Sequence, residues 1–102
     1  MNNNTYELMC KFCSTNSFYG KAIVREYEDN LVKTYKLYSY NTLVAIVSYD
    51  KLSSLVQYNY LGQFSSTTTR HQKEFFKQHG LNDNLIKDLF KQGYLEIFKG
   101  EC

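Results

Sequence analysis

Five hydroxyl side chains precede a histidine and a glutamate in the segment "FSSTTTRHQKEFF", residues 64 to 76. A hydroxyl from residues 65 to 69, His71 as general base and Glu74 as the acid would supply the residue types of a hydrolytic triad. The segment has no glycine-rich turn to expose a nucleophile and no identifiable oxyanion donor. We therefore predict that the hydroxyls begin a helix and that the chain has no catalytic residue here.

Cys10 and Cys13 form a C-x-x-C pair, which is the spacing of half a zinc site. A structural zinc ion needs four ligands, and His71, His79 and Cys102 are distant in the sequence. We expect no bound metal and no cofactor. Three cysteines, an odd number, also argue against a disulfide-bonded secreted protein and favour a reducing compartment.

The same hydroxyl segment leads into the first of two C-terminal helices. The pattern predicts a helix from about 70 to 78, with Thr69 and Gln72 as a capping box. Glu74 is expected to face solvent and to pair with Arg70 one turn away. The basic residues on this outer side, which we predict to bind a protein partner, are Arg70, Lys73 and Lys77.

The second helix is predicted in "NDNLIKDLFKQG", with Asn82 or Asp83 as its cap and Gly93 just past its end. The two helices and the "HGLN" between them have the lengths of a helix-turn-helix. The residues that would face a DNA groove are Asn84, Lys87, Lys91 and Gln92. Asp83 and Asp88 would repel phosphates. A small DNA- or RNA-binding regulator is thus the alternative to a helical hairpin that covers a sheet.

Tyrosines are abundant in the predicted strands. Tyr38 and Tyr40 are expected to share one face of a strand over residues 31 to 40 with Lys36. Tyrosine is favoured at binding surfaces, because it supplies contact area and loses little conformational entropy. We assign Tyr38 and Tyr40 to a partner-binding face, and cross-strand pairing on a half-exposed sheet explains them equally well.

These side chains require a scaffold, which the remaining pattern predicts as an α+β fold. "TYELMCKFC" has helical spacing, and four segments rich in β-branched and aromatic residues follow, joined by short turns. Connections this short favour an antiparallel meander. We expect about four strands, a short N-terminal helix and two C-terminal helices packed on the sheet, with "YLEIF" as a fifth strand or a tail. The predicted strand segments are "KAIVREYE", "LVKTYKLYSY", "LVAIVSY" and "LSSLVQYNYLG".

Length and charge exclude several classes of protein. With 102 residues the chain suits a single domain, 1–102, with one core. Its formal net charge of +2 is too small for a dedicated nucleic-acid or membrane-surface binder. No apolar run is long enough to span a membrane, and no signal peptide is recognisable. We expect a cytoplasmic protein.

The order "SFYGKA" at 17 to 22, "LYSYNTLVA" at 37 to 45 and "SSTTTRHQKEFFKQHG" at 65 to 80 resembles a family of small uncharacterised proteins. They are encoded by phages, plasmids and other mobile elements of low-GC Gram-positive bacteria. The resemblance implies counter-defence in the host cytoplasm, most concretely anti-CRISPR inhibition of an effector protein or ribonucleoprotein. It brings no catalytic residues, so we expect a non-enzymatic protein that acts by protein–protein binding, of unknown oligomeric state.

Overall fold

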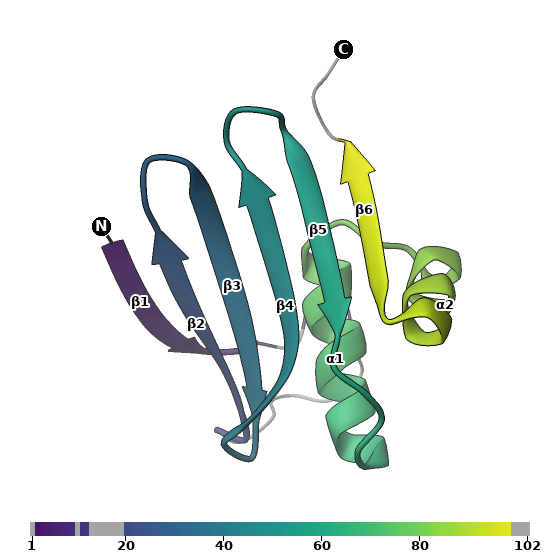
Figure 1. The fold of residues 1–102 in the computed structure, drawn as a ribbon. Helices are drawn as coiled ribbons and strands as arrows, with labels where there is room; N and C mark the ends of the chain where they lie inside the picture. The colour runs from purple at the N-terminus through teal and green to yellow at the C-terminus, as the bar shows by residue number, and fades with distance from the viewer. Residues whose placement is uncertain (1, 10, 13–19, 99–102) are drawn as a thin grey trace.

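A computed structural model describes residues 2–9, 11–12 and 20–98 (Figure 1). The fold is α+β, with six strands in one antiparallel sheet and two helices between the fifth and sixth strands. The strands are β1 (Asn2–Glu7), β2 (Ala22–Glu28), β3 (Val32–Ser39), β4 (Thr42–Asp50), β5 (Leu55–Tyr60) and β6 (Tyr94–Phe98). The helices are α1 (Ser66–Gln78) and α2 (Asp83–Gln92).

The sheet is a meander in which spatial order equals sequence order, from β1 to β6. Both helices lie on the same side of it, α1 behind β4 and β5 and α2 beside β6 (Figure 1). The other side is uncovered, and we call it the open face. Strand alternation assigns to it Asn3, Thr5, Glu7, Ile23, Arg25, Tyr27, Val32, Thr34, Lys36, Tyr38, Leu43, Ile46, Ser48, Asp50, Leu55, Gln57, Asn59, Tyr94, Glu96 and Phe98.

The predicted N-terminal helix is wrong, because residues 2–7 form the edge strand β1. Tyr6 lies opposite Val24 of β2, and the Leu8 amide continues the ladder by donating to the Ala22 carbonyl at 2.9 Å. A helix this short is marginal alone, whereas the unpaired edge of β2 offers partners for every second backbone group. The sheet therefore has six strands instead of about four. The three cysteines considered as possible zinc ligands lie outside the described residues, namely Cys10, Cys13 and Cys102.

The four predicted strands correspond to β2 through β5, and "YLEIF" is the strand β6. β4 is an inner strand, as its nearly continuous apolar sequence indicates. A bulge interrupts its pairing with β3, since the register passes from Leu37 and Ala45 to Tyr38 and Leu43. Val44 is left without a partner on β3, and its carbonyl accepts hydrogen bonds from α1 and from the Leu61 amide.

The core fills the space between the sheet and the two helices. Phe75 and Phe76 of α1 are fully buried, so they anchor this helix to the sheet. Tyr58 of β5 is equally buried, and its hydroxyl donates to the His79 carbonyl at the end of α1 at 2.8 Å. Of the helices in the described part of the chain, none is long and apolar enough to cross a membrane.

The beginning of α1 differs from the predicted capping box. The Ser65 hydroxyl accepts from the Thr68 amide at 3.1 Å, so the helix starts one turn earlier than expected. Thr69 donates its hydroxyl to the Ser65 carbonyl, and Gln72 donates to the carbonyls of Val44 and Gly62. In a run of hydroxyl residues several can cap. The bulge in β4 favours Ser65, because the Val44 carbonyl, which has no partner on β3, accepts from Gln72 and fixes the position of α1.

The ends of α2 follow the prediction. The Asn82 side chain accepts from the Leu85 amide at 2.9 Å, which identifies Asn82 as the cap. Gly93 ends the helix with φ of 79°, a left-handed conformation that glycine adopts without strain. Because β6 begins at the next residue, this glycine fixes the position of α2 relative to the edge of the sheet.

Candidate functional site

A groove of about 580 Å³ lies between α1 and α2. It is lined by Lys73, Lys77, Asp83, Ile86, Lys87, Phe90 and Lys91. Four of these side chains are lysines and one is an aspartate, so the lining is strongly basic. We call this site the lysine groove.

Apolar side chains form the floor of the lysine groove. Phe90 stacks on Tyr60 of β5, with ring centroids 4.2 Å apart and planes 14° apart. It also meets Phe76 edge to face at 6.4 Å, and Ile86 beside it is only 3 % exposed. These contacts hold the floor rigid, because each ring is packed on a side chain of the core.

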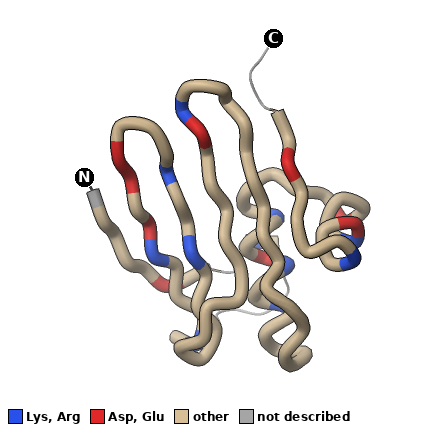
Figure 2. Tube along the Cα trace, in the orientation of Figure 1, with Lys and Arg blue, Asp and Glu red and all other residues tan. Residues whose placement is uncertain are grey.

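The rim of the lysine groove contains one ion pair between the helices. Lys77 Nζ of α1 lies 3.2 Å from Asp83 Oδ1, in the first turn of α2. Lys73, Lys87 and Lys91 are exposed. Figure 2 shows basic and acidic positions along both helices. This ion pair neutralises only one of the four lysines. The lysine groove therefore keeps a net positive charge, which attracts an anionic partner.

A smaller hollow of about 120 Å³ lies along α1 and is lined by Phe12, Arg70, Lys73, Glu74 and Lys77. The predicted pairing of Arg70 with Glu74 is wrong, since Glu74 is 2 % exposed. Its carboxylate accepts the amides of Lys11 at 2.8 Å and Phe12 at 3.1 Å. The backbone amides after β1 need an acceptor, and a buried carboxylate gains more from these donors than from a solvated arginine.

The structure brings together residues from two separate predictions. Lys73 and Lys77, assigned to a protein partner, meet Lys87 and Lys91, assigned to nucleic acid as the alternative. Arg70 lies in the adjoining smaller hollow. Two residues of the nucleic-acid set are exposed on α2 but do not line the groove, namely Asn84 and Gln92.

Tyr38 and Tyr40 do not share a face, which corrects the prediction. Tyr38 lies on the open face, where Arg25 Cζ is 5.0 Å from its ring centroid. Tyr40 is past the end of β3 with φ of 52°, and its ring lies 6.0 Å from that of His71. The strand ends at Ser39, so the alternation on which the prediction relied stops before Tyr40. Neither tyrosine lines the lysine groove.

His71 takes part in a buried network of hydroxyl groups. Ser39 Oγ lies 2.9 Å from His71 Nδ1 and 2.9 Å from Thr68 Oγ1, and all three residues are at most 3 % exposed. Burial lowers the pKa of His71 below its usual value of 6.5, and the charge of Arg70 lowers it further. The imidazole is therefore neutral. Glu74 hydrogen-bonds elsewhere, so the three residue types of a triad do not converge.

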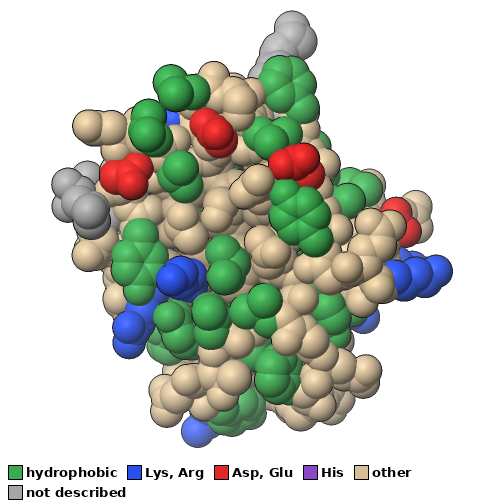
Figure 3. Space-filling view, in the orientation of Figure 1, with side chains coloured by type: hydrophobic (Ala, Val, Ile, Leu, Met, Phe, Trp, Pro, Cys, Tyr) green, Lys and Arg blue, Asp and Glu red, His purple; other side chains and the backbone are tan. Residues whose placement is uncertain are grey.

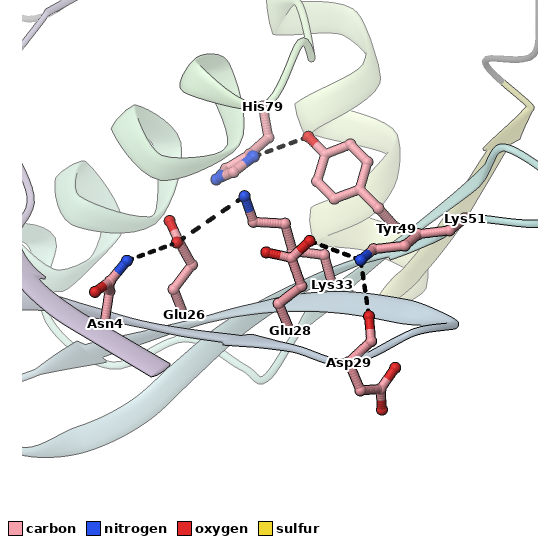
Figure 4. Close-up of polar contacts among 8 residues, drawn as sticks. All are labelled: Asn4, Glu26, Glu28, Asp29, Lys33, Tyr49, Lys51 and His79. Atoms are coloured by element: carbon pink, nitrogen blue, oxygen red, sulfur yellow. Dashed lines mark hydrogen bonds and ion pairs between the residues drawn. The ribbon is translucent and has the colours of Figure 1, made fainter. Parts of the chain in front are cut away.

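A polar cluster lies between strands β1 to β4 and the end of α1 (Figure 4). Glu26 Oε1 accepts from Asn4 at 3.3 Å and lies 4.0 Å from Lys33 Nζ. Tyr49 and His79 Nδ1 are hydrogen-bonded at 2.9 Å. Burial and the charge of Glu26 raise the pKa of Tyr6 to about 12, which keeps its hydroxyl protonated. Within the described ranges no three His, Cys, Asp or Glu side chains are placed to bind a metal.

The sequence analysis missed the way in which the two lysine pairs converge. Lys73 and Lys77 are four residues apart on α1, and Lys87 and Lys91 repeat that spacing on α2. Each pair forms a stripe on one side of its helix. Two matched stripes on consecutive helices were a readable signal of a shared basic site. The sequence could not show whether the stripes meet, because this depends on the angle between the helices.

Similarity to known proteins gives the chain a family but no activity. No curated protein and no solved structure matches it. A family model matches residues 6–92, a range that contains both helices and every residue of the lysine groove. The chain thus belongs to a protein family of unknown function, DUF8033.

Proposed function

We propose that this protein acts by binding another protein, without chemistry of its own, and that the partner presents an acidic segment to the lysine groove. The observation that carries the proposal is a rim of lysines around an apolar floor of Ile86 and Phe90. An amphipathic segment with carboxylates beside apolar residues satisfies both parts of such a site. Because the floor is packed on the core, binding requires little reordering of the protein.

An acidic protein segment fits the lysine groove better than nucleic acid does. Asp83 lines the groove, and Asp88 is exposed on the same helix. A phosphate backbone would meet these carboxylates along with the lysines. A peptide can avoid them by placing its own carboxylates only opposite the exposed lysines. The DNA- or RNA-binding regulator remains the second candidate, because Lys87 and Lys91 lie on the exposed side of α2.

The biological setting that we propose is counter-defence. The resemblance to small proteins of phages and other mobile elements supports it, and the most concrete version is an anti-CRISPR inhibitor of a host effector complex. The protein would then act in the cytoplasm of the host bacterium. An acidic surface patch on an effector protein, such as one that normally receives a basic partner, is the target that the lysine groove favours.

The first test is charge reversal in the lysine groove. We expect Lys73→Glu with Lys87→Glu to abolish inhibition in a cleavage assay with the host effector, and to weaken binding to an acidic amphipathic peptide at least about tenfold. Within the described part of the chain, neither lysine forms an ion pair that the substitutions would remove. Lys21→Glu, an exposed position away from the groove, is the matched control.

Three results would count against this proposal. If the double variant inhibits as well as the unchanged chain, the lysine groove is not the binding site. If the peptide does not bind but duplex DNA shifts in a salt-dependent manner, the regulator replaces the protein-binding function. If purified protein inhibits no effector although the peptide binds, the counter-defence setting is wrong and the site assignment stands.

A further inference from the structure

Phe12 is an exposed aromatic residue whose backbone is fixed to α1. Its side chain is 58 % exposed, but its amide donates to the Glu74 carboxylate at 3.1 Å. The neighbouring Lys11 amide donates to the same carboxylate at 2.8 Å. Glu74 is 2 % exposed, so these are hydrogen bonds to a buried charged group, which are the strong kind. Phe12 is therefore presented to solvent from an ordered backbone.

A second side chain of α1 holds the same segment. Gln78 Nε2 donates to the Met9 carbonyl and to Glu74 Oε2, at 2.6 Å in both cases. Gln78 follows Glu74 by one turn, so both reach the segment from one side of the helix. Large exposed side chains on a preordered backbone are typical of binding hot spots, because association then costs little conformational entropy.

Phe12 lines the smaller hollow along α1, which we call the Phe12 hollow. Lys73 and Lys77 line this hollow and the lysine groove alike. At about 100° per residue, Phe76 and Glu74 project from α1 on opposite sides of these two lysines. Phe76 contacts Phe90 of the groove floor, and Glu74 holds Phe12. The two lysines thus form a ridge, with an apolar contact site on each side.

We propose that the acidic segment of the partner crosses this ridge and uses both apolar sites. One of its apolar side chains enters the lysine groove and another packs against Phe12, while the carboxylates between them lie over Lys73 and Lys77. This inference rests on the proposed function and specifies its partner. The partner presents an acidic peptide segment that has an apolar residue on each side of its carboxylates.

The width of α1 sets the length of such a segment. The two apolar sites lie on opposite sides of the lysine ridge, about 10 Å apart if their separation is that of a helix diameter. An extended chain covers this distance in about three or four residues. Arg70, which lines the Phe12 hollow and lies outside the lysine groove, provides a further cation beside the path of the segment.

The open face is a poorer site for an acidic segment. Its two cations, Arg25 and Lys36, are accompanied by three carboxylates, those of Glu7, Asp50 and Glu96. Figure 3 shows hydrophobic side chains on this face with charged ones of both signs between them. In the Phe12 hollow the one acidic lining residue is buried and already accepts two backbone amides. The outer side of α1 therefore offers the more favourable electrostatic environment.

Substitution of Phe12 in the full chain tests the second apolar site. The probe is a synthetic peptide with two glutamates between two leucines, and its Kd is measured by fluorescence anisotropy. We expect Phe12→Ala to raise the Kd at least about tenfold, and Phe12→Leu, which keeps an apolar side chain, to raise it less than about threefold. Met9→Ala is the matched control, because Met9 lies in the same segment, is 55 % exposed and lines neither hollow. Circular dichroism establishes that each variant folds.

Two further peptides, each with one leucine replaced by serine, test whether Phe12 contacts the peptide directly. At least one of them should bind Phe12→Ala and the unchanged chain equally well, because it lacks the leucine that meets Phe12. If Phe12→Ala weakens the binding of both serine peptides tenfold, Phe12 shapes the site instead of contacting the partner, and the inference is wrong.

The lysine variant separates this inference from the proposed function. If Phe12→Ala binds the two-leucine peptide like Met9→Ala, while Lys73→Glu with Lys87→Glu no longer binds it, the inference is wrong and the proposed function stands. If the lysine variant binds the peptide as tightly as the unchanged chain, the proposed function is wrong and the inference fails with it.

Discussion

The two sides of the sheet differ in how they use polar and apolar side chains, because the covered side buries several polar groups within its apolar core. The side covered by α1 buries Ser39, Thr68, His71, Gln72 and Glu74, each at most 3 % exposed. The open face presents isoleucine, leucine, tyrosine and phenylalanine to its surroundings. Buried polar groups cost free energy unless they are hydrogen-bonded, and exposed apolar groups gain nothing until a partner covers them.

This difference separates what the fold needs from what is left for binding. On the covered side, hydrogen bonds from His71, Gln72 and Glu74 to β3, to the bulge in β4 and to the segment after β1 fix where α1 lies. Among the described residues only Gln72 Oε1 is buried without a partner. The open face has no comparable role in positioning α1, so its composition reflects another requirement.

The largest difference between the two sides is expected when one aromatic ring is removed from each. We expect Phe76→Ala to lower the free energy of unfolding by about 3–5 kcal/mol, because the ring is fully buried between the sheet and α2. Phe98→Ala on the open face, where the ring is 68 % exposed, should change it by no more than about 0.5 kcal/mol. Urea denaturation measures both.

Both variants should be measured at the same low protein concentration, so that association between copies makes no contribution to stability. An equally large loss for Phe98→Ala under these conditions would mean that the open face supports the fold of a single chain. The division between a structural side and a binding side would then be wrong.

A smaller effect is expected from protonating the covered side. Because the pKa of His71 is lower in the folded chain than its usual 6.5, the folded state binds fewer protons than the unfolded state. The stabilisation is complete above that value and is lost as the pH falls below it, by at most about 1.4 kcal/mol per pH unit. Unfolding measured between about pH 7 and 5 covers the range in which histidine titrates.

The variant His71→Gln should remove most of this pH dependence, since the amide does not titrate and can still bond to Ser39. The exposed carboxylates with lowered pKa, those of Glu28, Asp29 and Asp50, lose their contributions only at lower pH. An unchanged slope in His71→Gln would assign the pH dependence to a group outside the buried network.

The smallest expected effect compares two helix caps. Ser65→Ala should lower the free energy of unfolding by about 1 kcal/mol, since it removes the acceptor of the Thr68 amide. Thr69→Ala, at the position that the sequence pattern favours, should have less effect, because its hydroxyl only donates to a carbonyl that already accepts a backbone amide. If thermal denaturation shows a larger loss for Thr69→Ala than for Ser65→Ala, the predicted capping box is correct and α1 begins later than Ser66.

Local patterns predicted much of the fold, and long-range contacts decided the rest. The turn residues and β-branched runs indicated β2 to β5, and the Asn82 cap and Gly93 indicated α2, because these signals act within a few residues. β1 was mistaken for a helix because its strand pairing depends on residues about twenty positions away. Glu74 was placed outside for the same reason, since its partners are Lys11 and Phe12.

The candidate site was predicted in pieces. Arg70, Lys73, Lys77, Lys87 and Lys91 were all singled out from the sequence, but as two unrelated surfaces. Their convergence depends on how α2 crosses α1, which no local pattern encodes. The open face was missed because alternation in β2 and β3 shows that two faces differ, and does not show which one the helices cover.

The meander also determines the order in which the molecule can assemble. Each turn between β2 and β5 is short, so these strands can pair at a small cost in loop-closure entropy. β6 reaches β5 only after residues 61 to 93, including both helices, have been brought into place. We therefore expect the strands up to β5 to form first and β6 last. Since α2 is joined to β6 through Gly93 alone, the lysine groove would be completed in the final step of folding and opened in the first step of unfolding.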